Sequence, residues 1–210
     1  SKTRPRPLTA AELTDYGEEI VAGFAVPERS VCTQSLADDF VRAVDAEQAI
    51  TQQMRCWVTR VQQEKTGWSV VADVDGAAHR HGPYAKIVNC LWQNRALIDA
   101  SIGISREPSW THRYRVALFV YTRRPVPLRS AVIAVGPFGD VKNYDGHTLY
   151  LSWYDAGLLA EGTDLAPPPV PQLNNSARQT ISAHTLARLS RPIPSVPLSL
   201  IHISEPTRPY

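Results

Sequence analysis

The spacing of apolar residues in the first quarter of the chain predicts mostly helix. A Thr-x-x-Glu capping box is followed by apolar residues at helical intervals, which predicts a helix over Thr9–Val21. A short extended piece is expected over Phe24–Pro27, and a short strand over Val31–Thr33. Ser35–Val44 has one apolar and one charged side, so we predict an amphipathic helix there.

The pattern then changes to the short alternation that is typical of β-strands. A β-rich run covers Cys56–Gln63, and a second strand is predicted over Trp68–Val74. Asp75-Gly76 is a hairpin signal, after which Ala77–His81 is expected to pair back. These three segments therefore predict a small antiparallel sheet.

Ala85–Trp92 contains a short apolar run, which predicts a buried strand. This strand is expected to lead into a helix over Asn94–Ile102 that ends at Gly103. A β-strand followed directly by a helix would place the residues of the junction beside any ligand at the helix start.

The second half of the chain has the pattern of an antiparallel meander. Strands are predicted over Arg113–Thr122, Ser130–Val135 and His147–Tyr154, with a turn at Gly136–Asp140. A proline-rich linker follows, and a weak helix is expected over Asn175–Leu189. The complete set of elements predicts the α+β class.

Composition excludes several kinds of protein. The chain has 22 Lys and Arg against 20 Asp and Glu, and this near balance argues against nucleic acid or an anionic membrane as partner. It contains no run of 18 apolar residues, so no membrane span is expected. Cys32, Cys56 and Cys90 are an odd number without a CxxC motif, which predicts neither a disulfide framework nor a zinc ribbon. A reduced, cytoplasmic setting is expected.

Two further motifs of the sequence argue against specific sites. His79 and His81 share one strand face, but two histidines alone do not make a metal site, so no metal is predicted. Neither GxGxxG nor GxxxxGK[ST] is present, so the chain carries no phosphate-binding loop of either kind.

The order of the segments resembles a known family. A β run with Val58 and a hairpin precede Ile87-Val88-Asn89-Cys90-Leu91-Trp92-Gln93-Asn94. This order resembles the middle of the FAD-dependent oxidoreductases of the D-amino-acid oxidase, glycine oxidase and sarcosine oxidase superfamily, whose next strand ends in a pattern close to V-V-N-A-x-G-x-W. The resemblance covers Glu28–Gly157, although Leu91 and Trp92 stand where the family has small residues.

The resemblance implies FAD as cofactor and assigns residues to it. Val58 would lie against the adenine, and Asn89, Cys90, Leu91 and Trp92 would lie beside the pyrophosphate. From the residues alone, the pattern favours Val58 as a plain core valine of a strand, while Asn89 is equally well a helix cap or turn asparagine.

The second half resembles the substrate-domain sheet of the same family. The substrate-facing candidates are Arg113 and Arg115, which could pair with a substrate carboxylate, and Tyr150 and Ser152, which could line a pocket. The alternative is that the arginines are solvated charges and that both side-chain rows of the sheet are packed. No catalytic residue is assigned.

On this interpretation the chain is an α+β protein in which part of an FAD/NAD(P)-binding domain is joined to an antiparallel substrate-domain sheet. Residues 1–27 form a helix and linker, 28–103 the middle of the FAD-binding domain, 104–165 the sheet, and 166–210 a proline-rich linker and tail. Residues 198–210 resemble translated sequencing-adapter read-through, so we expect this tail to be an artefact.

The family opens with a GxGxxG module and closes with another glycine-rich segment, and the sequence contains neither. We therefore expect an internal fragment that lacks N- and C-terminal segments of its own chain. The first hypothesis is a flavin-dependent oxidoreductase that oxidises a C–H bond next to an amine of a small-molecule substrate, inactive as this fragment. The second is a non-enzymatic α+β binding module that uses the antiparallel sheet. A third is a scaffold that kept the fold and lost the cofactor.

Overall fold

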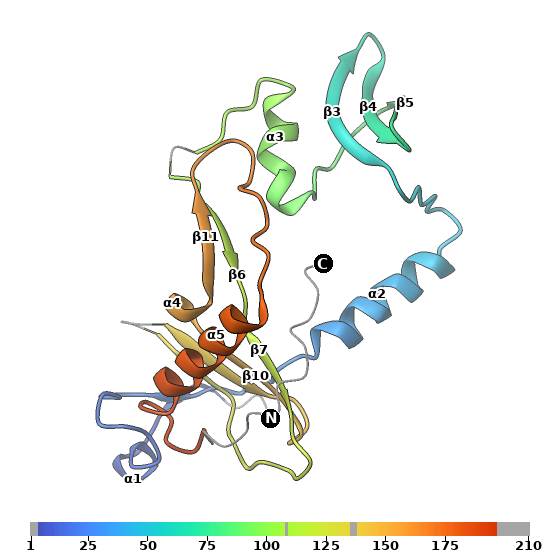
Figure 1. Cartoon of the computed structure of the whole chain (residues 1–210). Helices are drawn as coiled ribbons and strands as arrows, with labels where there is room; N and C mark the ends of the chain where they lie inside the picture. The colour runs from blue at the N-terminus through green and yellow to red at the C-terminus, as the bar shows by residue number, and fades with distance from the viewer. Residues whose placement is uncertain (1–3, 108, 135–137, 197–210) are drawn as a thin grey trace. The chain divides into compact units, whose positions relative to one another are not determined.

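The computed structural model describes residues 4–107, 109–134 and 138–196 (Figure 1). The chain forms two compact units, and each unit combines segments that are distant in sequence. Unit 1 consists of Ser1–Phe40, Arg115–Leu159 and Pro171–Tyr210, and unit 2 of Val41–Tyr114 and Ala160–Val170. This division differs from the four consecutive ranges that the sequence analysis predicts.

Unit 1 contains a four-stranded antiparallel sheet. Its strands lie in the order β7 (Leu118–Tyr121), β10 (Thr148–Trp153), β9 (Gly139–Asn143) and β8 (Ala131–Ile133). Strands β8, β9 and β10 form a meander of successive neighbours, and β7 pairs with the other edge of β10. The predicted meander of Arg113–Thr122, Ser130–Val135 and His147–Tyr154 is therefore wrong in its order, because the unpredicted strand β9 lies between β8 and β10 and β7 does not pair with β8. The sheet therefore joins a local meander to a strand from earlier in the chain.

The long strand predicted over Arg113–Thr122 is two strands. β6 (His112–Arg115) ends before Val116, whose backbone N–H donates to the carbonyl of Gly157 at 2.9 Å. β6 belongs to a separate two-stranded sheet with β11 (Leu158–Gly162). The predicted turn at Gly136–Asp140 is in part wrong, because its last two residues begin β9; residues 135–137 lie outside the described residues.

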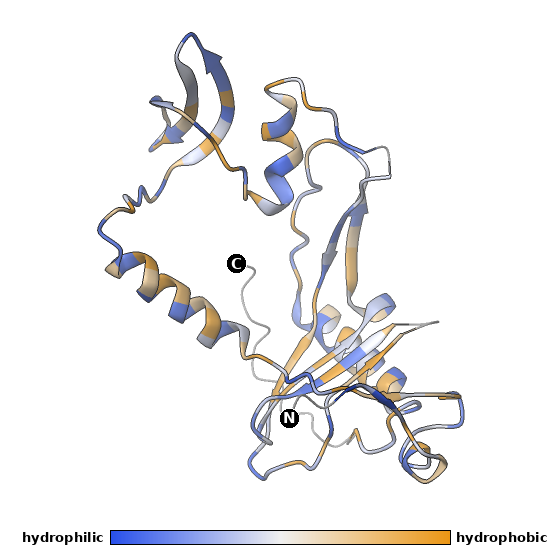
Figure 2. Ribbon diagram, turned by 180° about the vertical axis from the view of Figure 1, so that it is seen from behind, coloured by the Kyte–Doolittle hydropathy of each residue, from blue (hydrophilic) through white to orange (hydrophobic). Residues whose placement is uncertain are grey.

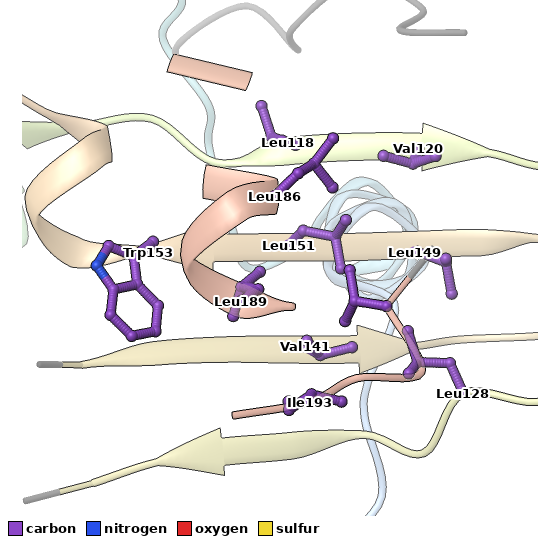
Figure 3. Packing of buried hydrophobic residues seen from close by; sticks show 11 residues of the cluster. Leu118, Val120, Leu128, Val141, Leu149, Leu151, Trp153, Leu186, Leu189 and Ile193 are labelled. Atoms are coloured by element: carbon purple, nitrogen blue, oxygen red, sulfur yellow. The ribbon is translucent and has the colours of Figure 1, made fainter. Parts of the chain in front are cut away.

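The core of unit 1 lies between this sheet and α5 (Asn175–Leu189), the helix predicted at the same residues (Figure 3). Leu186 and Leu189 of α5 lie against the sheet side chains, of which Leu149 and Leu151 are fully buried. The chain after the helix also enters the core, since Ile193 and Val196 are buried. The predicted linker and tail thus contain an essential core element, while the expected artefact at 198–210 lies outside the described residues.

The first predicted helix is much shorter than expected. α1 (Ala10–Leu13) has the predicted capping box, in which Thr9 N–H donates to the Glu12 carboxylate at 2.9 Å. The helix does not continue to Val21, because the backbone N–H of Gly17 donates to the carbonyl of Pro192 at 3.0 Å. The expected extended piece is confirmed as β2 (Phe24–Ala25), which pairs with β1 (Arg6–Pro7).

The predicted amphipathic helix is confirmed as α2 (Thr33–Ala46), on which Figure 2 shows both hydrophobic and hydrophilic residues. The strand predicted over Val31–Thr33 is wrong, because the helix begins at Thr33 and the Leu36 N–H donates to the Cys32 carbonyl at 3.1 Å. None of the residues of α2 is buried.

Unit 2 contains the predicted small sheet, formed by β3 (Trp57–Glu64), β4 (Gly67–Val74) and β5 (Ala77–Tyr84). Asp75 and Gly76 both have positive φ, as the hairpin signal between β4 and β5 predicts.

The predicted strand over Ala85–Trp92 is wrong. Residues 86–91 have no regular structure and lead into a 3-10 turn, η1 (Trp92–Asn94), and then into α3 (Arg95–Ala100). α3 contacts β3, and Ser101 just beyond it accepts the Val61 N–H at 3.0 Å.

These elements confirm the α+β class at the coarse level. The four-stranded and three-stranded sheets are antiparallel throughout, so neither contains the parallel βαβ unit that is typical of dinucleotide-binding domains. Among the described helices, none combines the length and the apolar composition that crossing a bilayer requires.

Candidate functional site on the sheet of unit 1

The strand register places two rows of side chains on the sheet face opposite α5. One row is Phe119, Tyr150 and Lys142, which are cross-strand neighbours on β7, β10 and β9. The other row is Ser152, Asp140 and Val132, on β10, β9 and β8. Side chains alternate along a strand, and the intervening residues form the core, so both rows lie on the same outer face. We call these six residues the polar face.

Tyr150 lies at the centre of the polar face. The Phe119 ring meets it edge-on with a centroid separation of 5.4 Å, and the Lys142 ammonium lies 4.7 Å from the Tyr150 ring centroid. Lys142 also pairs with Asp140 at 3.4 Å. Burial, followed by the charge of Asp140, raises the pKa of Tyr150, while a hydrogen bond with the Ser152 side chain lowers it. The phenol therefore stays protonated at neutral pH and can donate a hydrogen bond.

Arg115, at the end of β6, lies beside this face. Its guanidinium carbon is 3.3 Å from the centroid of the Tyr154 ring, and the Tyr154 ring in turn contacts Phe138 at a centroid distance of 5.6 Å. The Arg115 charge also acts on Tyr150, where it lowers the pKa against the larger raising effect of burial. Arg115 thus lies over the Tyr154 ring and close enough to Tyr150 for its charge to act on the phenol.

The Arg115 guanidinium has an unused donor. The Arg115 Nε is buried and has no hydrogen-bond partner among the described residues. The side chain also makes no ion pair with a carboxylate of the described residues. A buried N–H without an acceptor costs free energy, and a carboxylate is the acceptor that a guanidinium binds best. Arg115 and Lys142 carry two positive charges against the one negative charge of Asp140, so this site favours an anion.

Three of the four predicted substrate-facing residues come together at this site, namely Arg115, Tyr150 and Ser152. Arg113 does not join them. It belongs to unit 2, where its Nε donates to the Glu161 carboxylate at 3.0 Å. The alternation along one strand predicts a common face for both arginines, but β6 ends at Arg115 and the chain passes from one unit to the other there.

The sequence analysis misses the charged partners on β9. Asp140 is predicted in a turn, yet Asp140 and Lys142 flank the fully buried Val141 in a strand. This polar–apolar–polar alternation is the signal that could have placed both charges on the face opposite the core. Phe138 and Tyr154, which complete the aromatic surroundings of Arg115, lie just outside the strands and have no such periodic signal.

The residues that the resemblance assigns to FAD lie in unit 2. Val58 is a half-buried residue of β3, and the others lie before or within η1. Cys90 and Leu91 are exposed, and the Trp92 side chain is 88% exposed. Exposed side chains in an irregular segment are unlike the close backbone approach that a pyrophosphate needs.

The contacts of Asn89 also do not fit a pyrophosphate. Its amide donates to the Asp99 carboxylate at 2.8 Å and to the Arg95 carbonyl at 3.1 Å, and its oxygen accepts the Leu91 N–H at 3.2 Å. A carboxylate beside Asn89 repels a phosphate, and the Leu91 N–H is already used. Asn89 therefore has the role of a turn asparagine, one of the two alternatives open from the sequence.

A shallow cavity of about 240 Å³ lies elsewhere in unit 1 and includes none of the polar-face residues; its lining is Asp15, Tyr16, Pro127, Arg129, Ile193 and Ser195. In the described parts of the chain, no group of three or more His, Cys, Asp or Glu side chains could hold a metal ion.

Comparison of the chain with protein-family models, curated proteins and solved structures finds no match.

Proposed function

We propose that the polar face of unit 1, together with Arg115, binds a small organic carboxylate. The observation that carries this proposal is the unpaired Arg115 Nε beside a guanidinium stacked on Tyr154. Stacking on the Tyr154 ring restricts the guanidinium, and its Nε–H is unpaired, so a carboxylate that reaches this N–H edge can bind through two parallel hydrogen bonds. The site thus has its strongest donor already oriented.

The rest of the face favours a ligand with a planar or aromatic group. Phe119 and Tyr150 present two rings in edge-to-face contact, and a planar ligand group beside them would extend this aromatic packing. Lys142 adds a second positive charge next to Tyr150. An aromatic carboxylate such as benzoate therefore matches both the charge and the lining of the site.

Benzoate binding to the full chain, measured by calorimetry, tests the proposal with a matched pair of variants. Arg115→Gln should weaken binding by about tenfold or more, because a hydrogen bond to a charged group contributes about 1.5–3 kcal/mol. Arg113→Gln removes the same charge two residues away, from an arginine paired with Glu161, and should leave binding unchanged. Equal loss in both variants, or no benzoate binding to the unmodified chain, would contradict the proposal.

A second candidate function is the flavin-dependent oxidoreductase, in which the bound carboxylate would be an amino acid or related amine. It is supported by the segment order and by the three-stranded sheet β3–β4–β5, which lies where the resemblance predicts a β crossover. FAD would supply the hydride acceptor for the C–H bond next to the amine. The contacts of residues 89–92 do not fit a pyrophosphate, so we derive no step of this reaction from the chain.

The gene on both sides of this segment tests the second candidate. The flavoenzyme account expects an upstream strand–GxGxxG–helix module and a downstream glycine-rich segment in frame, and flavin absorbance bands in the purified full-length protein. Genuine start and stop codons that bracket these residues, or a full-length protein without flavin, would remove the oxidoreductase and leave carboxylate binding as the function.

A further inference from the structure

Unit 2 contains a second cluster of unpaired polar atoms, separate from the polar face. His112 on β6 is 6% exposed, and its Nε2 is buried without a hydrogen-bond partner. The indole Nε1 of Trp110 is likewise buried and has no partner in the described structure. The two rings contact each other edge-to-face with a centroid separation of 6.0 Å. Two neighbouring side chains thus each have an unsatisfied nitrogen.

Two arginines lie against the same tryptophan. The Arg95 guanidinium carbon is 4.8 Å from the centroid of the Trp110 ring, and Arg106 Nη1 donates to the Trp110 carbonyl at 3.2 Å. Arg95 is only loosely paired, at 3.7 Å, with Asp99, whose carboxylate also accepts from Asn89. Both guanidiniums therefore lie at the residue that carries one of the two unsatisfied nitrogens.

The chemistry of this cluster favours an oxyanion. The Trp110 indole N–H can only donate, His112 Nε2 donates when it carries a proton, and each guanidinium offers several donors. Two arginines against one carboxylate leave a positive excess. Buried polar atoms are almost always satisfied, so two adjacent exceptions indicate that a bound group belongs there. A group with negative charge and several acceptor oxygens is the ligand class that this combination of donors favours.

Arg95 also provides a route of entry. Its side chain is 50% exposed while its guanidinium lies over the Trp110 ring, so rotation of this one flexible side chain would open the ring face without moving the backbone. The same rotation would bring the guanidinium to the bound anion.

We propose that Trp110, His112, Arg95 and Arg106 form a binding site for a phosphate-type oxyanion in unit 2. This site is independent of the carboxylate site in unit 1, so either proposal can fail without the other.

Nitrogen-15 NMR of the full chain with inorganic phosphate tests the site. The Trp110 indole signal is identified by its loss in Trp110→Phe, and we expect it to shift saturably with phosphate at constant ionic strength. Arg106→Gln should weaken phosphate binding at least fivefold. Trp92→Phe is the matched control, because Trp92 is 88% exposed, and it should leave binding unchanged. Circular dichroism verifies that each variant is folded, and Arg95→Gln, at an exposed position, replaces Arg106→Gln if the latter is unfolded.

Three results would overturn the proposal. The first is the absence of a saturable shift of the Trp110 indole signal. The second is an equal shift with sodium chloride at the same ionic strength, which would indicate screening rather than binding. The third is an NMR exchange signal between water and the Trp110 indole N–H that phosphate does not change. Such a signal would mean that a buried water molecule, and not an anion, satisfies the two nitrogens. Acetate distinguishes the anion class, since equal binding of acetate would assign the site to carboxylates instead of phosphate-type anions.

Discussion

Two valines on adjacent strands of the unit 1 sheet differ strongly in burial, because they lie on opposite faces of the sheet. Val141 on β9 is fully buried beneath α5, whereas Val132 on β8 is 74% exposed on the polar face. Both are strand residues of the same type with comparable backbone roles. Their difference lies almost entirely in the apolar surface that folding removes from water.

Val141→Ala should therefore lower the free energy of unfolding by about 2 kcal/mol, from the lost burial and the cavity left behind. Val132→Ala should change it by less than about 0.5 kcal/mol. Urea denaturation of both variants measures the difference. Equal losses would mean that α5 does not cover this face of the sheet.

Tyr150 gives the polar face a measurable pH dependence. Burial raises its pKa above the ordinary value of 10, so the phenol is neutral in both the folded and unfolded states below that pH. As the pH rises through 10, the unfolded state ionises first, and this residue's contribution to stability is lost. Tyr150→Phe should therefore make the free energy of unfolding fall less steeply above pH 10. The difference in phenolate absorbance between the two proteins should appear above pH 10, and its appearance at lower pH would contradict the burial of Tyr150.

At the scale of elements, the local signals were reliable where the element depends on its own residues. The hairpin β4–β5, the amphipathic helix α2 and the helix α5 all follow from patterns within their own segments. The apolar run of Ala85–Trp92 predicts a strand, and this prediction is wrong. The Asn89 side chain instead makes hydrogen bonds to nearby backbone and side-chain groups, which stabilise an irregular turn. Asparagine side chains often compete with regular secondary structure by binding nearby backbone groups, and the pattern of hydrophobic residues does not reveal this.

The start of α5 offers a test at this scale. The Asn174 side chain accepts the backbone N–H of Ala177 at 2.8 Å, so Asn174→Ala should lower the free energy of unfolding by about 1 kcal/mol. Asn175→Ala, one residue later, removes the same side chain where no such cap bond exists and should have little effect. Thermal denaturation followed by circular dichroism compares them. A larger effect at Asn175 would move the helix start by one residue.

At the scale of the whole molecule, the sequence could not predict how distant segments combine. Unit 1 brings together Gly17 and Pro192 through a backbone hydrogen bond, and it places α5 on β10 although a proline-rich segment separates them. Such pairings depend on complementary surfaces that have no local periodic signal. The candidate site shows the same limit, because Arg115, Tyr150 and Ser152 could be proposed from the sequence. Placing Asp140 required the register of the sheet, and the contact of Tyr154 with Arg115 required the three-dimensional structure.

The separation of Arg113 from Arg115 is also a property of the whole molecule. Two arginines on one strand face look equivalent in the sequence, yet one is paired with Glu161 in unit 2 and the other faces Tyr154 in unit 1. The difference between these two residues makes the carboxylate proposal specific, since only one of them has an unused buried donor.

The most direct test of the carboxylate site is the position of bound benzoate on the full chain, measured by intermolecular nuclear Overhauser effects. The account predicts contacts from the benzoate ring protons to the side chains of Phe119 and Tyr150, because the Arg115 charge acts on Tyr150 and the Phe119 ring packs against Tyr150. Contacts to residues of unit 2, or to the core side of the sheet, would contradict it, and so would the absence of any contact at the polar face when benzoate is bound.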